Sequence, residues 1–283
     1  MFLGKIVDRL FIKKPRFRRL VTRAVYGTDD ANVNVFGLKL LVNSARENGY
    51  LRASNASRKY SLLKDETATL MNLIALIDRG DTFLDVGANI GIFSSVIARS
   101  ARLKPGVRIM AFEVDPSTFV RLAANGKEHG FDCMNVGVAE VAATATFVRG
   151  AVSHVTTRED HVNSYNIPGL TFAAKLLPLS DIEIPGRSIV IKVDVEGMEW
   201  EVLCGAWSLF EDDRVKAIYF DGAKEQGKIR ERLAGAGFEF YDGRTLEPAE
   251  ANVFSLLAIK SRSSGLALKS AAASSARLYN STA

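Results

Sequence analysis

Apolar residues follow two different spacings along this chain, and the change comes near residue 80. Before it, they recur every three or four positions, which predicts an amphipathic helix that opens at Asp65 and Glu66 and ends before Gly80. After it, short apolar runs alternate with helical patterns, and we expect strands over residues 82–86, 108–113, 134–138, 144–148, 188–194, 215–220, 238–241 and 253–259. The last two are expected to pair antiparallel. This alternation predicts an α/β domain with a mostly parallel sheet and helices on both faces.

The region before this domain, residues 1–80, holds two further elements. Residues 1–23 have apolar residues at helical spacing with basic residues between them, and Pro15 interrupts the pattern. We expect a basic amphipathic arm there, followed by a hairpin within residues 33–42.

Two later segments lack a clear period. Residues 150–187 contain several prolines and glycines, and we expect them to be an insertion or lid within the domain, which spans residues 81–260. Residues 261–283 are rich in serine and alanine and are expected to form a disordered tail.

The basic excess of the chain lies at its two ends. The whole chain has 37 Lys and Arg against 32 Asp and Glu, a net charge of +5. Residues 1–23 carry eight basic residues and one acid, and residues 260–283 carry four basic residues and no acid, which leaves residues 24–259 at −6. A surface that binds nucleic acid needs Lys and Arg across it, so the acidic body argues against a nucleic-acid partner. The arm is expected either to contact an anionic membrane surface or to dock its apolar side on the body.

Other features of the composition exclude several classes of protein. No apolar run reaches the roughly 18–20 residues that cross a bilayer. The charged residues Lys5, Asp8 and Arg9 make the N-terminus a poor signal peptide. Cys133 and Cys204 lie far apart and in no metal-ligand spacing, so neither a disulfide nor a metal site is expected. We therefore expect a cytoplasmic protein, peripheral at the inner membrane surface if the arm binds lipid.

The first segment with chemical content is DVGANIG at residues 85–91, where a strand ends at Asp85 and a glycine turn leads into a helix. A glycine such as Gly87 takes turn conformations closed to other residues and lets a ligand come close. In open parallel sheets, ligands bind at the carboxyl ends of the strands, beside such a turn. The spacing departs from the dinucleotide fingerprint, because Asn89 and Ile92 stand where its second and third glycines would be. A nicotinamide-dependent oxidoreductase is therefore disfavoured.

The second segment is the end of the next expected strand. Glu113 lies there, 22 residues beyond Gly91, where an acid can accept hydrogen bonds from both hydroxyls of a ribose. The alternative is that Glu113 and Asp115 only cap the helix that follows, with Pro116 in its first turn.

The third segment is the end of a nearly continuous apolar strand, residues 188–194. Asp194 ends this strand, and Glu196 and Glu199 follow at the start of a helix. These carboxylates are consistent with an active site, and equally with capping and with the favourable placement of acids near a helix N-terminus. Lys192 could pair with one of them in a purely structural role.

Together, DVGANIG, AFEVDP at residues 111–116 and IKVDVEG at residues 191–197 resemble the FkbM-type methyltransferases, a branch of the S-adenosylmethionine-dependent class I methyltransferases. The segments come in the order and spacing of that family, and the similarity covers roughly residues 81–259. The resemblance implies a Rossmann-like class I methyltransferase fold, with a seven-stranded, mostly parallel sheet that has one antiparallel strand at its edge. Residues 81–260 would be the catalytic domain.

The resemblance also implies residue roles. S-adenosylmethionine would be the cofactor, its amino-acid end wrapped by the glycine turn and its ribose held by Glu113. The cofactor-binding residues on this basis are Asp85, Gly87, Ala88, Asn89, Gly91, Glu113, Val114 and Asp194. Asp194 would face the transferred methyl group and is the first candidate for a general base, followed by Glu196 and Glu199. His154 and His161, in the segment without a period, are further candidates.

Two departures from the family's pattern leave the acceptor contacts unassigned. Leu179, Ser180 and Asp181 stand where the family often has an acidic pair with leucine, and residues 150–187 match no known part of it. The expected reaction is O-methylation of a hydroxyl on a saccharide, glycolipid or small secondary metabolite, with no metal required. The alternatives are a non-catalytic binding or scaffold protein of the same fold, or a nucleic-acid methyltransferase.

Overall fold

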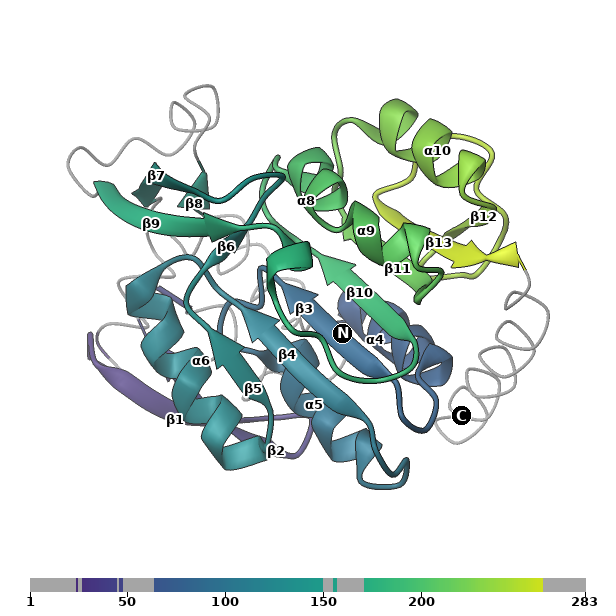
Figure 1. Cartoon of the computed structure of the whole chain (residues 1–283). Helices are drawn as coiled ribbons and strands as arrows, with labels where there is room; N and C mark the ends of the chain where they lie inside the picture. The colour runs from purple at the N-terminus through teal and green to yellow at the C-terminus, as the bar shows by residue number, and fades with distance from the viewer. Residues whose placement is uncertain are drawn as a thin grey trace, which may run out of the picture.

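The computed structural model describes residues 24, 27–44, 46–47, 64–149, 155–156 and 171–261. Its centre is a seven-stranded sheet in the order β12-β13-β11-β10-β3-β4-β5 (Figure 1). The strands are β3 (Thr82–Val86), β4 (Arg108–Phe112), β5 (Asp132–Met134), β10 (Ile189–Val193), β11 (Val215–Asp221), β12 (Phe238–Asp242) and β13 (Ser255–Lys260). The expected α/β fold with a mostly parallel sheet is confirmed.

The topological switch point of the sheet lies between β3 and β10. β3 pairs in parallel with β4 on one side and with β10 on the other, so successive crossovers leave in opposite directions. Open α/β sheets bind ligands outside the carboxyl ends of the strands at such a point. The β3–β10 register places Asp85 beside Lys192, one residue before both strands end.

The antiparallel strand is not at the edge, which corrects one detail of the expected sheet. β13 pairs antiparallel with both β11 and β12, so it lies one position inside the sheet and β12 forms the edge. The physical reason is burial. Residues 255–259 of β13 are all buried, and a strand whose two faces are both buried suits an interior position in the sheet.

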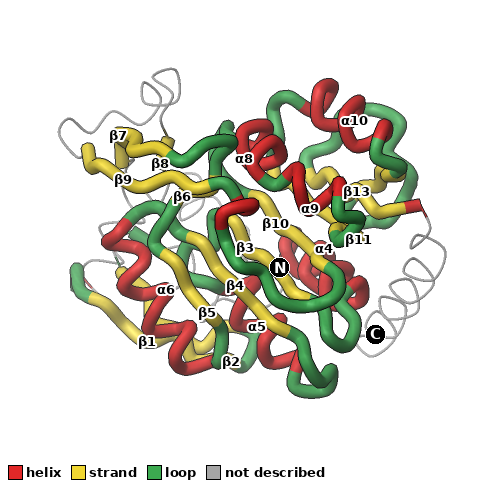
Figure 2. The backbone as a smooth tube through the Cα atoms, in the orientation of Figure 1, coloured by secondary structure: helices red, strands yellow, loops and turns green. Residues whose placement is uncertain are grey.

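Helices cover both faces of the sheet, as Figure 2 shows. Alternate strand residues divide between two apolar clusters, with Phe83 and Val190 in one and Leu84 and Ile191 in the other. The first cluster takes in α4 (Lys64–Leu76), α5 (Ile92–Ala101) and α6 (Pro116–His129). The second takes in α8 (Glu199–Gly205), α9 (Trp207–Glu211) and α10 (Gln226–Gly235).

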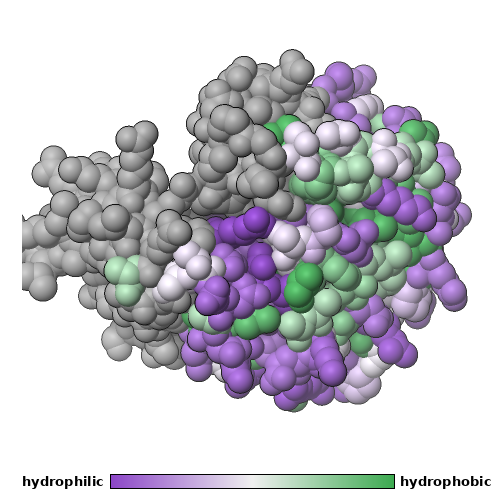
Figure 3. Space-filling view, turned by 90° about the vertical axis from the view of Figure 1, so that its left-hand side faces the viewer, coloured by the Kyte–Doolittle hydropathy of each residue, from purple (hydrophilic) through white to green (hydrophobic). Residues whose placement is uncertain are grey.

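A second, four-stranded sheet has the order β6-β9-β7-β8. Its strands are β6 (Gly137–Val138), β7 (Ala143–Arg149), β8 (Val155–Thr156) and β9 (Thr171–Leu177), and the short helix η3 (Leu179–Asp181) follows. In Figure 1 it lies on the side to which the arrows of β3, β4 and β10 point. On the face turned to the viewer in Figure 3, hydrophobic and hydrophilic residues are interspersed over the described part.

This sheet changes the picture of two segments. The single strand expected over residues 134–138 is divided between β5 in the large sheet and β6 in the small one. Within residues 150–187, expected as an insertion or lid, β9 pairs along most of its length with β7. Residues 150–154 and 157–170, with His154 and His161, lie outside the described residues, so the lid stays a prediction.

The N-terminal hairpin consists of β1 (Asp30–Val35) and β2 (Leu38–Asn43), which pair antiparallel. Phe36 and Gly37 form its two-residue turn, and both have positive φ (53° and 73°), as the right-handed twist of a tight hairpin requires. The arm over residues 1–23 and the tail from residue 262 lie outside the described residues. Among the helices that the structure does describe, none is long and apolar enough to cross a membrane.

Candidate active site

Three charged side chains meet where β3 and β10 end. Lys192 is buried, and its Nζ lies 3.1 Å from Asp85 Oδ1 and 3.5 Å from Asp194 Oδ2. The Asp85 side chain is 1% exposed, whereas that of Asp194 is 40% exposed. The ammonium group therefore joins an inner carboxylate to an outer one, and only the outer one is open to a ligand.

Asp85 lies beneath the glycine turn. Its Oδ2 accepts hydrogen bonds from the backbone N–H and the hydroxyl of Ser94, at 3.2 and 2.7 Å, while its Oδ1 faces Lys192. In this arrangement the carboxylate fixes Lys192 and the first turn of α5. Direct contact of Asp85 with a cofactor stays a prediction.

The turn itself is shaped by close packing. Gly87 has φ +75°, and a Cβ there would lie 1.9 Å from the carbonyl oxygen of Asp194. Gly91, with φ +81°, precedes α5, and a Cβ there would lie 2.6 Å from Leu122. Both glycines therefore let the turn pack closely against neighbouring segments of the protein. This reason for glycine differs from the one expected for Gly87, namely the close approach of a ligand. Ala88 is buried, and its N–H donates to the carbonyl of Phe112.

Asn89 presents an unused polar atom. Its backbone has the left-handed φ of 54°, and its Oδ1 is buried without a hydrogen-bond partner. A buried polar atom that lacks a partner costs free energy, on the order of 1–3 kcal/mol, unless a ligand or water satisfies it. This atom is therefore a ready acceptor for the amino group of a bound molecule.

Glu113 stands beside Asn89 at the end of β4. Its Oε2 accepts from the backbone N–H of Asn89 at 2.9 Å, and its Oε1 accepts from that of Asp115 at 2.8 Å. Burial raises the pKa of Glu113 to about 7, against the lowering effect of these two hydrogen bonds. Each oxygen keeps a second lone pair, so the carboxylate can still accept from a diol.

The residues around Glu113 hold it in place. Asp115 caps α6 by accepting from the N–H of Ser117 at 2.8 Å, as the capping interpretation expected. Asn135 donates from Nδ2 to the carbonyl of Glu113 at 2.7 Å. Val114 is half-buried and packs with the apolar cluster of the small sheet. Contact of Val114 with a cofactor stays a prediction.

Asp194 is the first candidate for a general base. Although its side chain is 40% exposed, the protein packed around the carboxyl group desolvates it and raises its pKa to about 6, while the ammonium of Lys192 acts in the opposite direction. A carboxylate with a pKa close to the working pH takes up a proton more readily than an ordinary one, yet is still ionised at pH 7.

The other two predicted bases differ from Asp194. Glu199 is buried, and its Oε1 accepts from the N–H of Gly197 at 2.8 Å, so it caps the turn before α8. Burial raises the pKa of Glu199. Glu196 is half-buried, has a left-handed φ of 51°, and its charge raises the pKa of Asp194. The general base stays a prediction, with Asp194 as its first candidate.

Two carboxylates at this edge were not singled out from the sequence. Asp221 ends β11, next to β10, and accepts from the Tyr219 hydroxyl at 2.5 Å. Glu66 lies in the first turn of α4, and its pKa is raised to about 7, first by desolvation and then by the charge of Asp194. Asp221 could have been found by the strand-end rule that found Asp194. Glu66 could not, because only tertiary packing brings α4 to this edge.

The site fits S-adenosylmethionine in its chemistry. The unpartnered Asn89 oxygen suits the amino group of the methionine end, and the Glu113 carboxylate suits the ribose hydroxyls. The outer carboxylate of Asp194 suits a neighbouring positive charge. Among the residues that the structure describes, there is no group of three or more His, Cys, Asp or Glu side chains that could hold a metal ion.

Several methyltransferases are among the solved structures that match this chain. The FkbM methyltransferase of Methylobacillus flagellatus is 13% identical with a TM-score of 0.43, and the match covers 75% of this chain and 52% of that one. This chain thus spans about half the length of that protein. A TehB-like SAM-dependent methyltransferase of Corynebacterium glutamicum is 14% identical with a TM-score of 0.41, over 75% of this chain and 97% of that one. An rRNA methylase of Streptococcus thermophilus is 12% identical with a TM-score of 0.36, over 69% and 96%.

Sequence families give a closer assignment. No curated protein matches this chain. The Methyltransferase FkbM domain, however, matches residues 85–240, more than half of the 283 residues. The matched region begins at Asp85 and includes Glu113, Lys192 and Asp194. The sheet of this chain has the α/β architecture of the class I methyltransferases, and the matched motifs lie at its switch point. The chain belongs to the FkbM methyltransferase family.

Proposed function

We propose that this protein is an S-adenosylmethionine-dependent O-methyltransferase that acts on a hydroxyl of a saccharide, glycolipid or small secondary metabolite, with Asp194 as its general base. The observation that carries the proposal is the outer carboxylate of Asp194, 40% exposed at the switch point and 3.5 Å from a buried ammonium group. Family membership supports methyl transfer, and the unpartnered Asn89 oxygen beside Glu113 supports the cofactor.

The residues of the site divide the work of the reaction. When bound, the cofactor supplies a methyl group on a positively charged sulfur. Asp194 accepts the proton of the acceptor hydroxyl while the hydroxyl oxygen attacks the methyl group. This proton transfer would contribute roughly 10²- to 10⁴-fold to the rate. Lys192 holds Asp194 in place and keeps it ionised near neutral pH. Glu113 and Asn89 orient the donor, so that attack can occur in line.

The acceptor class follows from the charges at this edge. Asp194 follows β10 and Asp221 ends the neighbouring β11, and the charges of both act on Glu66. Lys192, which pairs with Asp194, is buried. Carboxylates accept hydrogen bonds from hydroxyl groups and repel phosphates. A neutral polyhydroxyl acceptor therefore suits this site better than a nucleic acid.

The experiment combines a binding measurement with a transfer measurement. Titration calorimetry should show heat with S-adenosylmethionine and none with NAD. Incubation with methyl-labelled cofactor and separate fractions of bacterial polysaccharide, glycolipid, small molecules and RNA should place the label in one of the first three. Binding without transfer to any fraction would favour a scaffold protein, and label in RNA would contradict the proposed acceptor.

The pH dependence of turnover gives a separate prediction. Asp194 must be ionised to accept a proton, so kcat should fall as the pH drops through about 6, the raised pKa of this group, and should level off above pH 7. Burial raises the pKa of Glu113 to about 7, and its protonation would act on cofactor affinity, so the rates are measured at saturating cofactor. A kcat that is unchanged between pH 5 and pH 8, in protein shown by circular dichroism to stay folded, would contradict the assignment.

A further inference from the structure

The N-terminal hairpin precedes the family domain, yet it packs against the glycine turn. Its apolar side, formed by Val33, Val35, Leu38, Leu40 and Val42, clusters with Ile90 and Ile92, which flank Gly91. Ile90 is fully buried and Ile92 is 5% exposed. The hairpin thus forms one wall behind the residues expected to hold the methionine end of the cofactor.

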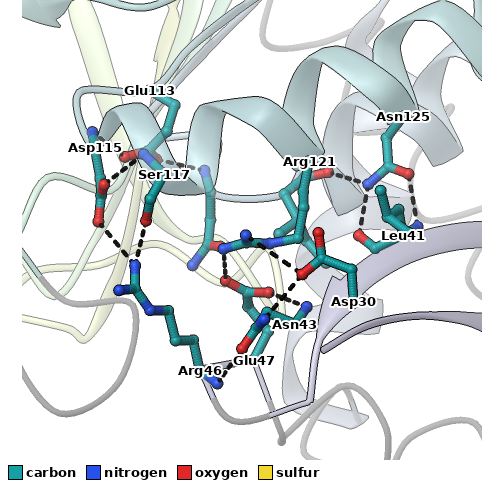
Figure 4. Close-up of polar contacts among 12 residues, drawn as sticks. Asp30, Leu41, Asn43, Arg46, Glu47, Glu113, Asp115, Ser117, Arg121 and Asn125 are labelled. Atoms are coloured by element: carbon teal, nitrogen blue, oxygen red, sulfur yellow. Dashed lines mark hydrogen bonds and ion pairs between the residues drawn. The ribbon is translucent and has the colours of Figure 1, made fainter. Parts of the chain in front are cut away.

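A single side chain of α6 joins the hairpin to that turn. Asn125 accepts from the N–H of Leu41 at 2.7 Å, and its Nδ2 donates to the carbonyl of Leu41 at 3.1 Å and to that of Ile90 at 2.8 Å. Figure 4 shows this amide beside β2. All three bonds are side chain to backbone, so they fix the relative position of the two segments whatever residues occupy positions 41 and 90.

The residues just after β2 reach the other part of the site. The guanidinium of Arg46 contacts the Ser117 hydroxyl and lies 3.9 Å from Asp115 Oδ2 (Figure 4). Asp115 is the residue whose N–H donates to Glu113 Oε1. A single intervening residue, Asp115, therefore links Arg46 to the carboxylate expected to hold the ribose.

A buried ion pair keeps Arg46 in this place. Glu47 has a fully buried side chain, and its Oε1 lies 2.6 Å from Arg121 of α6, while its Oε2 accepts from the N–H of Asn43. The side chain of Arg121 is 6% exposed and also lies 3.7 Å from Asp30. Figure 4 shows the pair between α6 and the end of β2. Since a buried pair of this kind is strongly destabilising to break, the backbone at residues 46 and 47 is anchored.

We propose that Arg46 is a positioning residue of the cofactor site: by holding Asp115 and Ser117 at the start of α6, it sets the orientation of the Glu113 carboxylate and thereby the affinity for the cofactor. The inference rests on the proposed function for the identity of that cofactor. It makes a segment outside the family domain a working part of the site.

The test compares Arg46→Ala with a matched control. Arg99→Ala removes a different arginine contact to the same hairpin, from Arg99 to the carbonyl of Gly37 at 3.0 Å, at the far end from Glu113. For each variant and for the wild-type protein, calorimetry gives the Kd for S-adenosylhomocysteine, and hydrogen exchange followed by NMR gives the protection of the Asn89 and Asp115 amides. With Arg46→Ala we expect a Kd about ten-fold higher, the size expected for a lost hydrogen bond to a charged group, and faster exchange at both amides.

Further readouts separate positioning from a general loss of structure. Arg99→Ala should leave both the Kd and the exchange of these amides within two-fold of wild type, and Arg46→Lys should recover part of the affinity because it keeps the charge beside Asp115. At saturating cofactor, kcat of Arg46→Ala should stay within about two-fold, because the chemistry at Asp194 is untouched.

Two results would overturn the proposal: an unchanged Kd with unchanged amide exchange in Arg46→Ala, or equal losses in Arg46→Ala and Arg99→Ala. Failure of the wild-type protein to bind S-adenosylhomocysteine would instead count against the proposed function. The amide exchange of the unliganded protein would then still decide whether Arg46 positions Glu113.

Discussion

Replacing Asp194 with asparagine should lower kcat by roughly 10²- to 10⁴-fold, the contribution of a well-placed general base. Asparagine keeps the size of the side chain and can still contact Lys192, but it cannot accept a proton from the acceptor. The Kd for S-adenosylmethionine should change by no more than a few-fold, because the expected cofactor contacts at Asn89 and Glu113 remain.

Single-turnover rates and calorimetry on the same preparation separate the two effects. Glu199→Gln is the matched control, because Glu199 is buried and bonded to the Gly197 N–H rather than open to a ligand. It should cost stability more than turnover. Normal turnover in Asp194→Asn, or a loss confined to cofactor binding, would remove Asp194 from the role of base.

Replacing Lys192 with methionine should destabilise the fold by about 3–5 kcal/mol, the usual cost of removing one partner from a buried ion pair. The carboxylate of Asp85, with a side chain 1% exposed, would lose the ammonium that faces its Oδ1 and keep only Ser94. Thermal unfolding should show a fall in Tm of about 10 °C.

Two further variants make this prediction specific. Lys228→Met removes a lysine whose side chain is 62% exposed and pairs with Glu225, three residues earlier. Because a surface pair contributes little to stability, this variant should change the Tm very little. In the double variant Lys192→Met, Asp85→Asn the uncompensated charge is gone, and the loss should be smaller than for Lys192→Met alone. A double variant as unstable as the single one would mean that packing of the lysine chain, and not the ion pair, supports the site.

Much of the central domain could be predicted from the sequence, because its signals are local. The strand–turn–helix at residues 82–101 is recognisable from a short apolar run, Gly87 and Gly91, and the strand-end position of Glu113 and Asp194 follows from the same periodicity. The resemblance to the FkbM-type methyltransferases then predicted that these motifs belong to one sheet. The physical reason for Gly87 needed the structure, since it is the carbonyl of Asp194, 107 residues away, that leaves no room for a Cβ.

What could not be predicted depends on contacts between distant segments. Glu66 reaches the site only because α4 packs along the sheet, where Asn72 donates to the carbonyls of Gly243 and Arg244. Arg46 follows a hairpin that carries no motif, and the Ser117 hydroxyl that it contacts lies 71 residues further along the chain. In β9, the alternation of half-buried and exposed residues is too weak to read as a strand without its partner β7.

The inward place of β13 has a consequence for how the chain is made. During synthesis every strand from β3 to β12 leaves the ribosome before residues 255–260. Until β13 is made, β11 has an unpaired, apolar edge, and β12 has no neighbouring strand in the sheet. An exposed hydrophobic edge of this kind invites pairing with another chain. The sheet is therefore completed from the inside by its last strand, and a chain that stops short of residue 255 loses two strands, not one.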